Sequence, residues 1–314
     1  MTKPIEDKLD KIPIINIFVR FFKKAKLPGL EGLSFYDLME LYITGLVKGA
    51  LSSRASAIAF SFFMAVFPFL LFVLIIIPYV PIDDFKIEFL RFLDSFLPPQ
   101  TSEFFFDNIF YNIDQSQRGG LLSSVFILSI ILMANGVNAV FSGFANSYHH
   151  QLSRNVFRQY LYALGVALIL SFLLIFTIAI LGYFQIYFIQ KLLDTLENRG
   201  YEVGYQSVFW FAIAKYVFFV FIVYIGTATL YYFGTKEGKY SKFFSVGAWF
   251  TTLLIILLSY LFGLYIEHFA QYNKLYGSIG ALLILMFYLW LNANILLLGF
   301  ELNMSLNRLR RRKE

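Results

Sequence analysis

The chain has 314 residues, of which 59% are apolar and only 15% are charged. A soluble globule of this length could not bury so large an apolar share, so the composition excludes an ordinary soluble protein and indicates surface in contact with lipid. Basic residues outnumber acidic ones by 26 to 20, and the absence of cysteine excludes disulfides and thiolate metal sites.

Long, charge-poor apolar runs are the main feature of the sequence. Each exceeds the roughly 20 residues that a helix needs to cross a bilayer, and helices satisfy their backbone hydrogen bonds internally, as lipid requires. We therefore predict an all-α, polytopic membrane protein, a bundle of six transmembrane helices with N-terminal amphipathic helices and a long aromatic outer loop. The approximate spans are 57–80, 120–144, 160–188, 207–233, 243–266 and 276–300.

The distribution of Lys and Arg predicts how these spans are oriented. Nineteen of the 26 lie in segments on one side of the spans, and six lie on the other. Because basic residues are enriched on the cytoplasmic side, we expect both termini to be cytoplasmic. The chain then divides into a cytoplasmic amphipathic N-terminal region (1–53), a six-span transmembrane domain (54–303) and a basic cytoplasmic tail (304–314).

The N-terminal region contains a predicted basic helix between Pro13 and Leu27, followed by a second helix from Ser34 to about Leu51. The apolar stripe of the first helix suits either the surface of an anionic inner leaflet or packing on the protein's own spans. Both alternatives stay open at this point.

The first span combines small side chains from Ala55 to Ser61 with Pro68 near its middle. Small residues let neighbouring helices approach closely in lipid, and proline removes one backbone hydrogen bond and favours a kink. Such a kink could line a transport path or be a static bend in the bundle. The outer loop that follows, residues 83–118, is rich in phenylalanine. We expect it to cap the bundle, with the membrane interface or an amphiphilic ligand as alternatives.

The second run carries Asn135 and Asn138 one helical turn apart, followed by His149 and His150 near the cytoplasmic end. Amides in lipid usually bridge helices, so we favour that role over ligand binding. No metal site is predicted, because a zinc site would need further ligands and the chain has only 3 histidines.

Lys215 is the one charge well inside a predicted span. It could snorkel to the outer interface, or face the bundle interior and pair with Glu267 or, less directly, His268. At the opposite surface, Arg54 and Glu301 end the first and last spans and form a second candidate pair. We regard Lys215, Glu267, His268, Asn135, Asn138 and Pro68 as candidate residues of a substrate path.

The sequence contains no phosphate-binding glycine loop, no H-E-x-x-H and no G-x-S-x-G. We therefore predict no catalytic residues, no cofactor and no enzymatic activity.

Several segments of the predicted spans form recognisable motifs. They are Tyr276 to Gly280, Tyr288 to Trp290 and Leu298 to Asn303, with further segments at Ala55 to Pro68, Gly143 to Asn146, Gly247-Ala248 and Tyr272 to Tyr276. Together they resemble the YihY/BrkB family of bacterial integral membrane proteins, formerly labelled ribonuclease BN. Phe300 and the pair Gly234-Thr235 depart from the family pattern, which often has a small residue at the first position and a proline at the second.

The resemblance implies a multi-pass protein of the bacterial inner membrane. It suggests a role in moving a lipid or another amphiphile during envelope maintenance, with an envelope scaffold as the alternative and a tRNA-processing ribonuclease as the least favoured function. The partners expected are membrane lipids and an anionic amphiphile, with no specific nucleic acid. The substrate and the oligomeric state stay open.

Overall fold

The computed structural model describes residues 34–36, 50–76, 119–145, 155–183, 205–236, 242–269 and 278–311. Six long helices account for nearly all of them, and each is long and apolar enough to cross a membrane. The predicted all-α fold with six membrane helices is therefore confirmed. The helices are α4 (Ala50–Ile76), α8 (Gly119–Ala145), α9 (Val156–Tyr183), α11 (Tyr205–Gly234), α12 (Val246–Phe269) and α14 (Ser278–Arg311).

Two of these helices begin at a polar capping residue. Asn155 precedes α9, where its side chain accepts a hydrogen bond from the backbone N–H of Phe157 at 3.4 Å. Ser245 precedes α12 and accepts in the same way from the N–H of Ala248 at 3.3 Å. Such caps satisfy N–H groups that have no partner within the helix, so they define where a helix begins.

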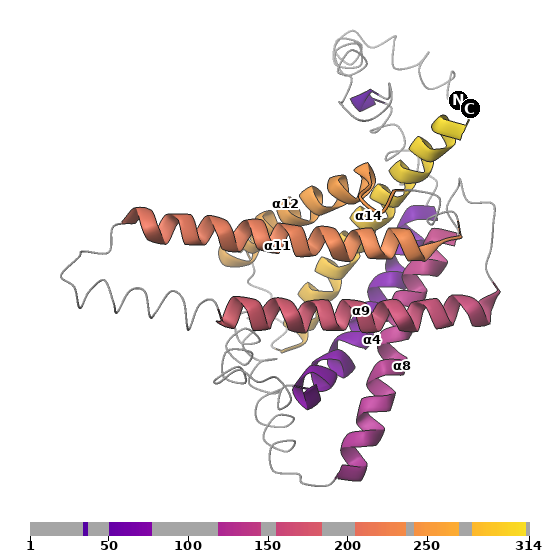
Figure 1. Cartoon of the computed structure of the whole chain (residues 1–314), viewed down its shortest axis with the longest axis vertical. Helices are drawn as coiled ribbons and strands as arrows, with labels where there is room; N and C mark the ends of the chain where they lie inside the picture. Colours follow the sequence, from indigo (N-terminus) through magenta and orange to yellow (C-terminus); the bar gives the residue numbers. More distant parts are fainter. Residues whose placement is uncertain are drawn as a thin grey trace.

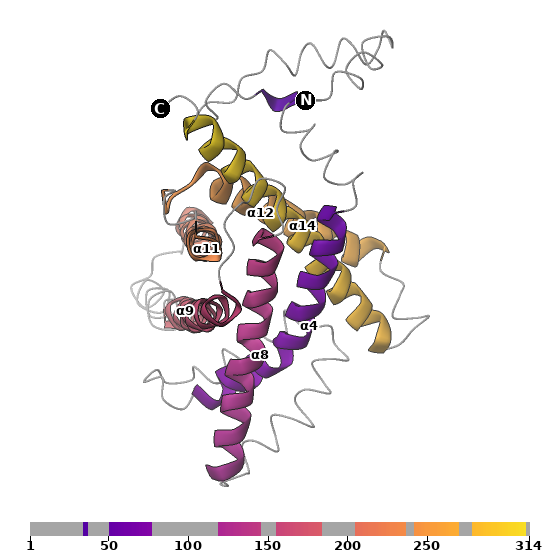
Figure 2. The ribbon, with the colours of Figure 1, turned by 90° about the vertical axis from the view of Figure 1, so that its right-hand side faces the viewer.

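Helices that follow one another in sequence also pack against one another, and α14 returns to contact α4. α8 lies at the centre, where it touches α4, α9, α11 and α14. Figures 1 and 2 show that α9 and α11 lie side by side and run across the direction of α4, α8 and α14. The six helices therefore do not form a simple up-and-down bundle of parallel helices.

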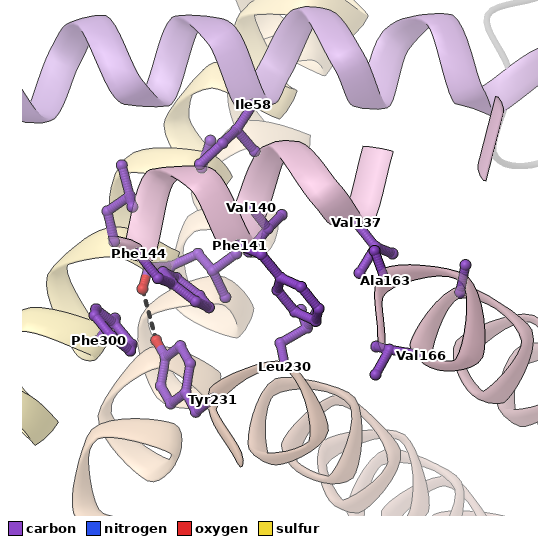
Figure 3. Packing of buried hydrophobic residues seen from close by; sticks show 14 of the residues in the cluster. Ile58, Val137, Val140, Phe141, Phe144, Ala163, Val166, Leu230, Tyr231 and Phe300 are labelled. Atoms are coloured by element: carbon purple, nitrogen blue, oxygen red, sulfur yellow. Dashed lines mark hydrogen bonds between the residues drawn. The ribbon is translucent and has the colours of Figure 1, made fainter. Parts of the chain in front are cut away.

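One hydrophobic core joins all six helices, and its largest fully buried side chains include Phe141, Phe144 and Phe300. Figure 3 shows Phe141 and Phe144 of α8 pointing towards Leu230 and Tyr231 of α11. Large apolar residues also lie on the outside, as a helix surrounded by lipid requires. Examples are Phe172, Leu257 and Tyr260.

The helices extend furthest beyond the predicted spans at the start of α4 and at the end of α14. α4 begins at Ala50 and continues through Pro68 to Ile76, so the proline does not end it. α14 continues to Arg311, well past the predicted end of the last span. Its extension is held by Leu302 and Leu306, which pack against Val246 and Phe250 of α12.

Several predictions lie outside the described residues. These are the N-terminal basic helix, the aromatic outer loop at 83–118, and the histidines at 149 and 150. The division into three regions also stays a prediction.

Candidate functional site

An ion pair joins the first and last membrane helices. Arg54 of α4 and Glu301 of α14 meet with their Nη2 and Oε1 atoms 3.1 Å apart, and their side chains are only 12% and 11% exposed. Arg54 also donates from Nη1 to the carbonyl oxygen of Gly143, at 3.0 Å, near the end of α8. One guanidinium group therefore holds three helices together, and the pair proposed from the sequence is present.

Two residues before Glu301, α14 approaches α12 closely at Gly299. Gly247 and Gly299 face each other so tightly that a Cβ atom on Gly299 would lie 2.8 Å from the carbonyl oxygen of Gly247 and would overlap Oγ1 of Thr251. A Cβ atom on Gly247 would in turn overlap the carbonyl oxygen of Gly299. Only glycine allows two helix backbones to come this close.

Asn303 of α14 supplies a hydrogen-bond partner to the backbone at the start of α12. Its Oδ1 atom accepts a hydrogen bond from the backbone N–H of Gly247 at 2.8 Å, and its Nδ2 atom donates to Oγ of Ser245 at 2.7 Å. The first N–H groups of a helix lack partners within that helix, and leaving them unpaired at a buried site is costly. Asn303 and Ser245 together therefore fix where α12 begins against α14.

A third polar contact lies between these helices and α11. The hydroxyl of Tyr231 donates to the carbonyl oxygen of Leu296 at 2.7 Å and is 2.6 Å from Oγ1 of Thr251. All three groups are buried, and Figure 3 shows Tyr231 with one hydrogen bond drawn. We refer to Arg54, Tyr231, Ser245, Thr251, Glu301 and Asn303 together as the polar junction.

The two departures from the family pattern meet beside the polar junction, at the ring of Phe144. Phe300 stacks on this ring with a centroid distance of 4.1 Å, and Tyr231 contacts it edge-on at 5.6 Å. Gly234 lies against the same ring, since an added Cβ atom would be 2.5 Å from Cδ2 of Phe144. A large residue at 300 and a glycine at 234 thus accommodate the same aromatic side chain.

A separate polar contact joins α8 and α9. Gln159 donates from Nε2 to Oδ1 of Asn138 at 2.9 Å and to Oγ of Ser142 at 3.1 Å. Asn138 therefore bridges two helices. Asn135 does not, because its side chain is exposed and makes no hydrogen bond within the described part of the chain. The expectation that both amides bridge helices of this chain is thus wrong for Asn135.

The remaining candidates are not brought together. Lys215 is exposed on α11, which agrees with the snorkelling alternative rather than with a buried charge. Glu267 and His268 belong to the last turn of α12, but their side chains lie outside what the structure describes. Their pairing with Lys215 stays a prediction. Pro68 is half-buried within α4.

Sequence reasoning singled out Arg54 and Glu301 of the polar junction because they end their spans on the same side. It did not single out Tyr231, Ser245 or Thr251 of the junction, nor Gln159 of the separate contact with α8. A polar side chain in an apolar helix gives no sign of the helix it will meet. Within the described residues, no three His, Cys, Asp or Glu side chains are grouped as metal ligands would be.

Six apolar helices around a single core, with a polar junction that joins α4, α11, α12 and α14, define a multi-pass membrane protein. The family model described as Virulence factor BrkB matches residues 43–314 of the chain. The chain therefore belongs to the BrkB family, as the resemblance in its last span implied.

Two relatives show how far this family likeness extends. The chain is 26% identical over 259 residues to the "Putative ribonuclease-like protein YfkH" of Bacillus subtilis. This match covers 82% of the present chain and 90% of the relative. It is 22% identical over 287 residues to the UPF0761 membrane protein PsycPRwf_0630 of a Psychrobacter strain. That match covers 88% of this chain but only 50% of the relative. No solved structure matches the chain.

Proposed function

We propose that this protein moves an anionic lipid or another anionic amphiphile between the leaflets of a bacterial inner membrane, with both of its termini in the cytoplasm. The excess of basic residues at the two ends of the chain supports this orientation. In this orientation the Arg54–Glu301 pair lies at the cytoplasmic end of the contact between α4 and α14.

The observation that carries the proposal is the burial of this ion pair. A charged side chain inside a membrane bundle is costly and usually marks a functional position. A purely structural contact between α4 and α14 could be made from apolar residues, which often stabilise a protein as well as a buried ion pair does. The pair, unlike an apolar contact, can be exchanged for contacts with an anionic headgroup.

The proposed mechanism is a latch between the first and last helices. Arg54 holds Glu301 and the end of α8 in the closed state. A phosphate group entering from the cytoplasmic surface would compete with the Glu301 carboxylate for the guanidinium, because both accept paired hydrogen bonds from arginine. Release of Glu301 would then allow α4 and α14 to separate.

The test is transbilayer movement of a fluorescent anionic lipid in liposomes that contain the purified protein. Since the chain has no cysteine, Arg54→Cys and Glu301→Cys can be combined and joined by a short, reducible thiol cross-linker. The double variant lacks the guanidinium that would bind the headgroup, so we expect it to move lipid more slowly than the wild type. Linking should slow this remaining movement further, and reduction should restore it to the level of the unlinked double variant. Each single-cysteine variant, treated in the same way, is the control. Lipid movement equal to that of protein-free liposomes in the wild-type sample would reject the proposal.

An envelope scaffold is the second candidate, and the position of Lys215 favours it. The lysine is exposed on α11 rather than turned towards the core, so it offers no inward-facing charge to a substrate. A scaffold would show no lipid movement in liposomes, and cells without the protein would still have altered envelope integrity. Lys215→Ala would then leave both properties unchanged.

The name of the Bacillus subtilis relative includes the word ribonuclease. We propose that the present chain has no such activity and that it requires no cofactor. Incubation of the purified protein with transfer RNA and divalent cations tests this. Cleavage of the transfer RNA that copurifies with the folded protein and is lost when Glu301 is substituted would contradict the proposal.

A further inference from the structure

The outer side of α8 carries an amide group in the middle of a membrane helix. Asn135 lies within one turn of the midpoint of α8, and its side chain is exposed. Its neighbours on the same side are exposed apolar residues: Leu128 is 55% exposed and Ile131 is 42% exposed. An otherwise lipid-facing surface therefore contains one group that can both donate and accept hydrogen bonds.

The amides nearby do not satisfy Asn135. Gln159 directs its Nε2 group to Asn138 and Ser142 instead, and Asn138 thereby gains its own partner. Tyr160 donates its hydroxyl to the carbonyl oxygen of Ile131, one turn before Asn135. Lipid tails offer no hydrogen-bonding group, so an exposed amide at this depth is unfavourable unless another molecule supplies a partner.

We propose that α8 forms a two-fold interface between two copies of this chain, in which Asn135 pairs with Asn135 of the second copy. Both copies have the same orientation in the membrane, so the symmetry axis is parallel to the membrane normal. Residue 135 then lies at the same depth in each copy. A carboxamide is complementary to itself, because its carbonyl oxygen accepts from the NH₂ group of an identical partner.

The spacing along α8 defines the extent of this interface. Leu128, Ile131 and Asn135 are separated by three and four residues, the alternation that packs two helices along one seam. Asn138 and Ser142 continue this spacing but are engaged by Gln159 of α9. The interface therefore ends near Asn135, with the two apolar residues packing on one side of it. A single asparagine in such a seam fixes the register of the two helices.

A lipid headgroup is a less suitable partner for Asn135. Phosphate and glycerol groups reside near the membrane surface, whereas Asn135 lies near the middle of α8. Arg158, the charge beside Gln159, belongs to the first turn of α9. A second copy supplies the required amide at the correct depth without moving any charge into the membrane.

The test uses the natural absence of cysteine in this chain. We introduce Leu128→Cys or Ile131→Cys singly, which leaves Asn135 in place, and oxidise the full-length protein in liposomes over a series of lipid dilutions. Phe172→Cys on α9 and Leu257→Cys on α12 are exposed controls of similar kind. We expect a disulfide-linked dimer from the α8 positions that persists on dilution, and only dilution-sensitive background from the controls.

Substitution of the amide then separates its role from that of the apolar surface. Asn135→Ala, added to Ile131→Cys, should weaken dimerisation by roughly five- to thirty-fold, as expected for loss of two hydrogen bonds between helices in lipid. Asn135→Gln, which retains an amide, should restore most of it. Equal cross-linking at α8 and control positions, or no response to Asn135→Ala in a protein that remains monodisperse in detergent, would overturn the proposal.

Discussion

α14 and α11 each carry a charge in a membrane span, and the protein accommodates the two charges in opposite ways. Glu301 of α14 is turned inward, buried and paired with Arg54. Lys215 of α11 is exposed. The acidic side chain is short, and its carboxylate meets a guanidinium inside the bundle. The lysine side chain is long, and its four methylene groups can remain in lipid while the ammonium group reaches the interface.

This difference indicates where sequence changes will matter. An inward charge depends on a particular partner, so removing that partner leaves a buried charge uncompensated. An exposed charged side chain reaches the membrane interface through its own length and flexibility, without a particular partner. The region around α14 should therefore be sensitive to single substitutions, and the outer side of α11 should tolerate them.

The largest effect is expected from Gly299→Leu. Its side chain would overlap Thr251 and approach the Tyr231 hydroxyl, so α12 and α14 could not keep their contact. Overpacking against backbone and a buried hydrogen bond should cost at least about 3 kcal/mol. We expect loss of the monodisperse peak in detergent size-exclusion chromatography. Gly165→Ala is the control, because nothing lies within 4 Å of a Cβ atom at that position. A stable Gly299→Leu protein would refute this close contact.

The next largest effect concerns the ion pair. Arg54→Ala removes the guanidinium that pairs with the buried Glu301 carboxylate, for which we expect a loss of about 3–5 kcal/mol in unfolding free energy. Thermal unfolding in detergent measures it. The double exchange Arg54→Glu with Glu301→Arg should recover part of the loss, although it gives up the bond from Arg54 to Gly143. No recovery in the double variant would show that the two charges do not act through each other.

A smaller effect is expected from Asn303→Ala. This change leaves the N–H of Gly247 at the start of α12 without its acceptor and removes the bond to Ser245. Loss of a helix cap of this kind costs about 0.5–2 kcal/mol. Asn292→Ala is the matched control, since Asn292 donates only to Tyr288 of its own helix. Equal destabilisation of both variants, measured by thermal unfolding, would argue against an interhelical cap.

The smallest effect is expected from Lys215→Met, which keeps a long apolar side chain and removes the charge. We expect a change within about 0.5 kcal/mol, as for most exposed substitutions. Lys215→Asp should be more destabilising in liposomes, because a short carboxylate cannot snorkel from the same position. A large effect of Lys215→Met on stability would mean that the lysine has a specific partner, such as Glu267.

The number and type of helices could be predicted from the sequence, because an apolar run longer than a bilayer has few alternatives to a membrane helix. The Arg54–Glu301 contact could be predicted as well, since both residues end spans on the same side. The close approach of Gly247 to Gly299 could not be predicted. In lipid a helix is apolar on all sides, so hydrophobic periodicity does not show which side faces a neighbour. For the same reason the sequence did not show that Asn135, which we expected to bridge helices, lies on the outer side of α8.

The distance along the chain between the two ends of the ion pair has a consequence for biosynthesis. Arg54 and Glu301 are 247 residues apart in sequence. At a synthesis rate of about 5–20 residues per second, roughly 12–50 seconds separate the appearance of the arginine from that of its partner. During this interval α4 must already reside in the membrane with its guanidinium group held by water, lipid phosphate or the insertion machinery. The first helix can therefore reach its final position only after the last helix has been made.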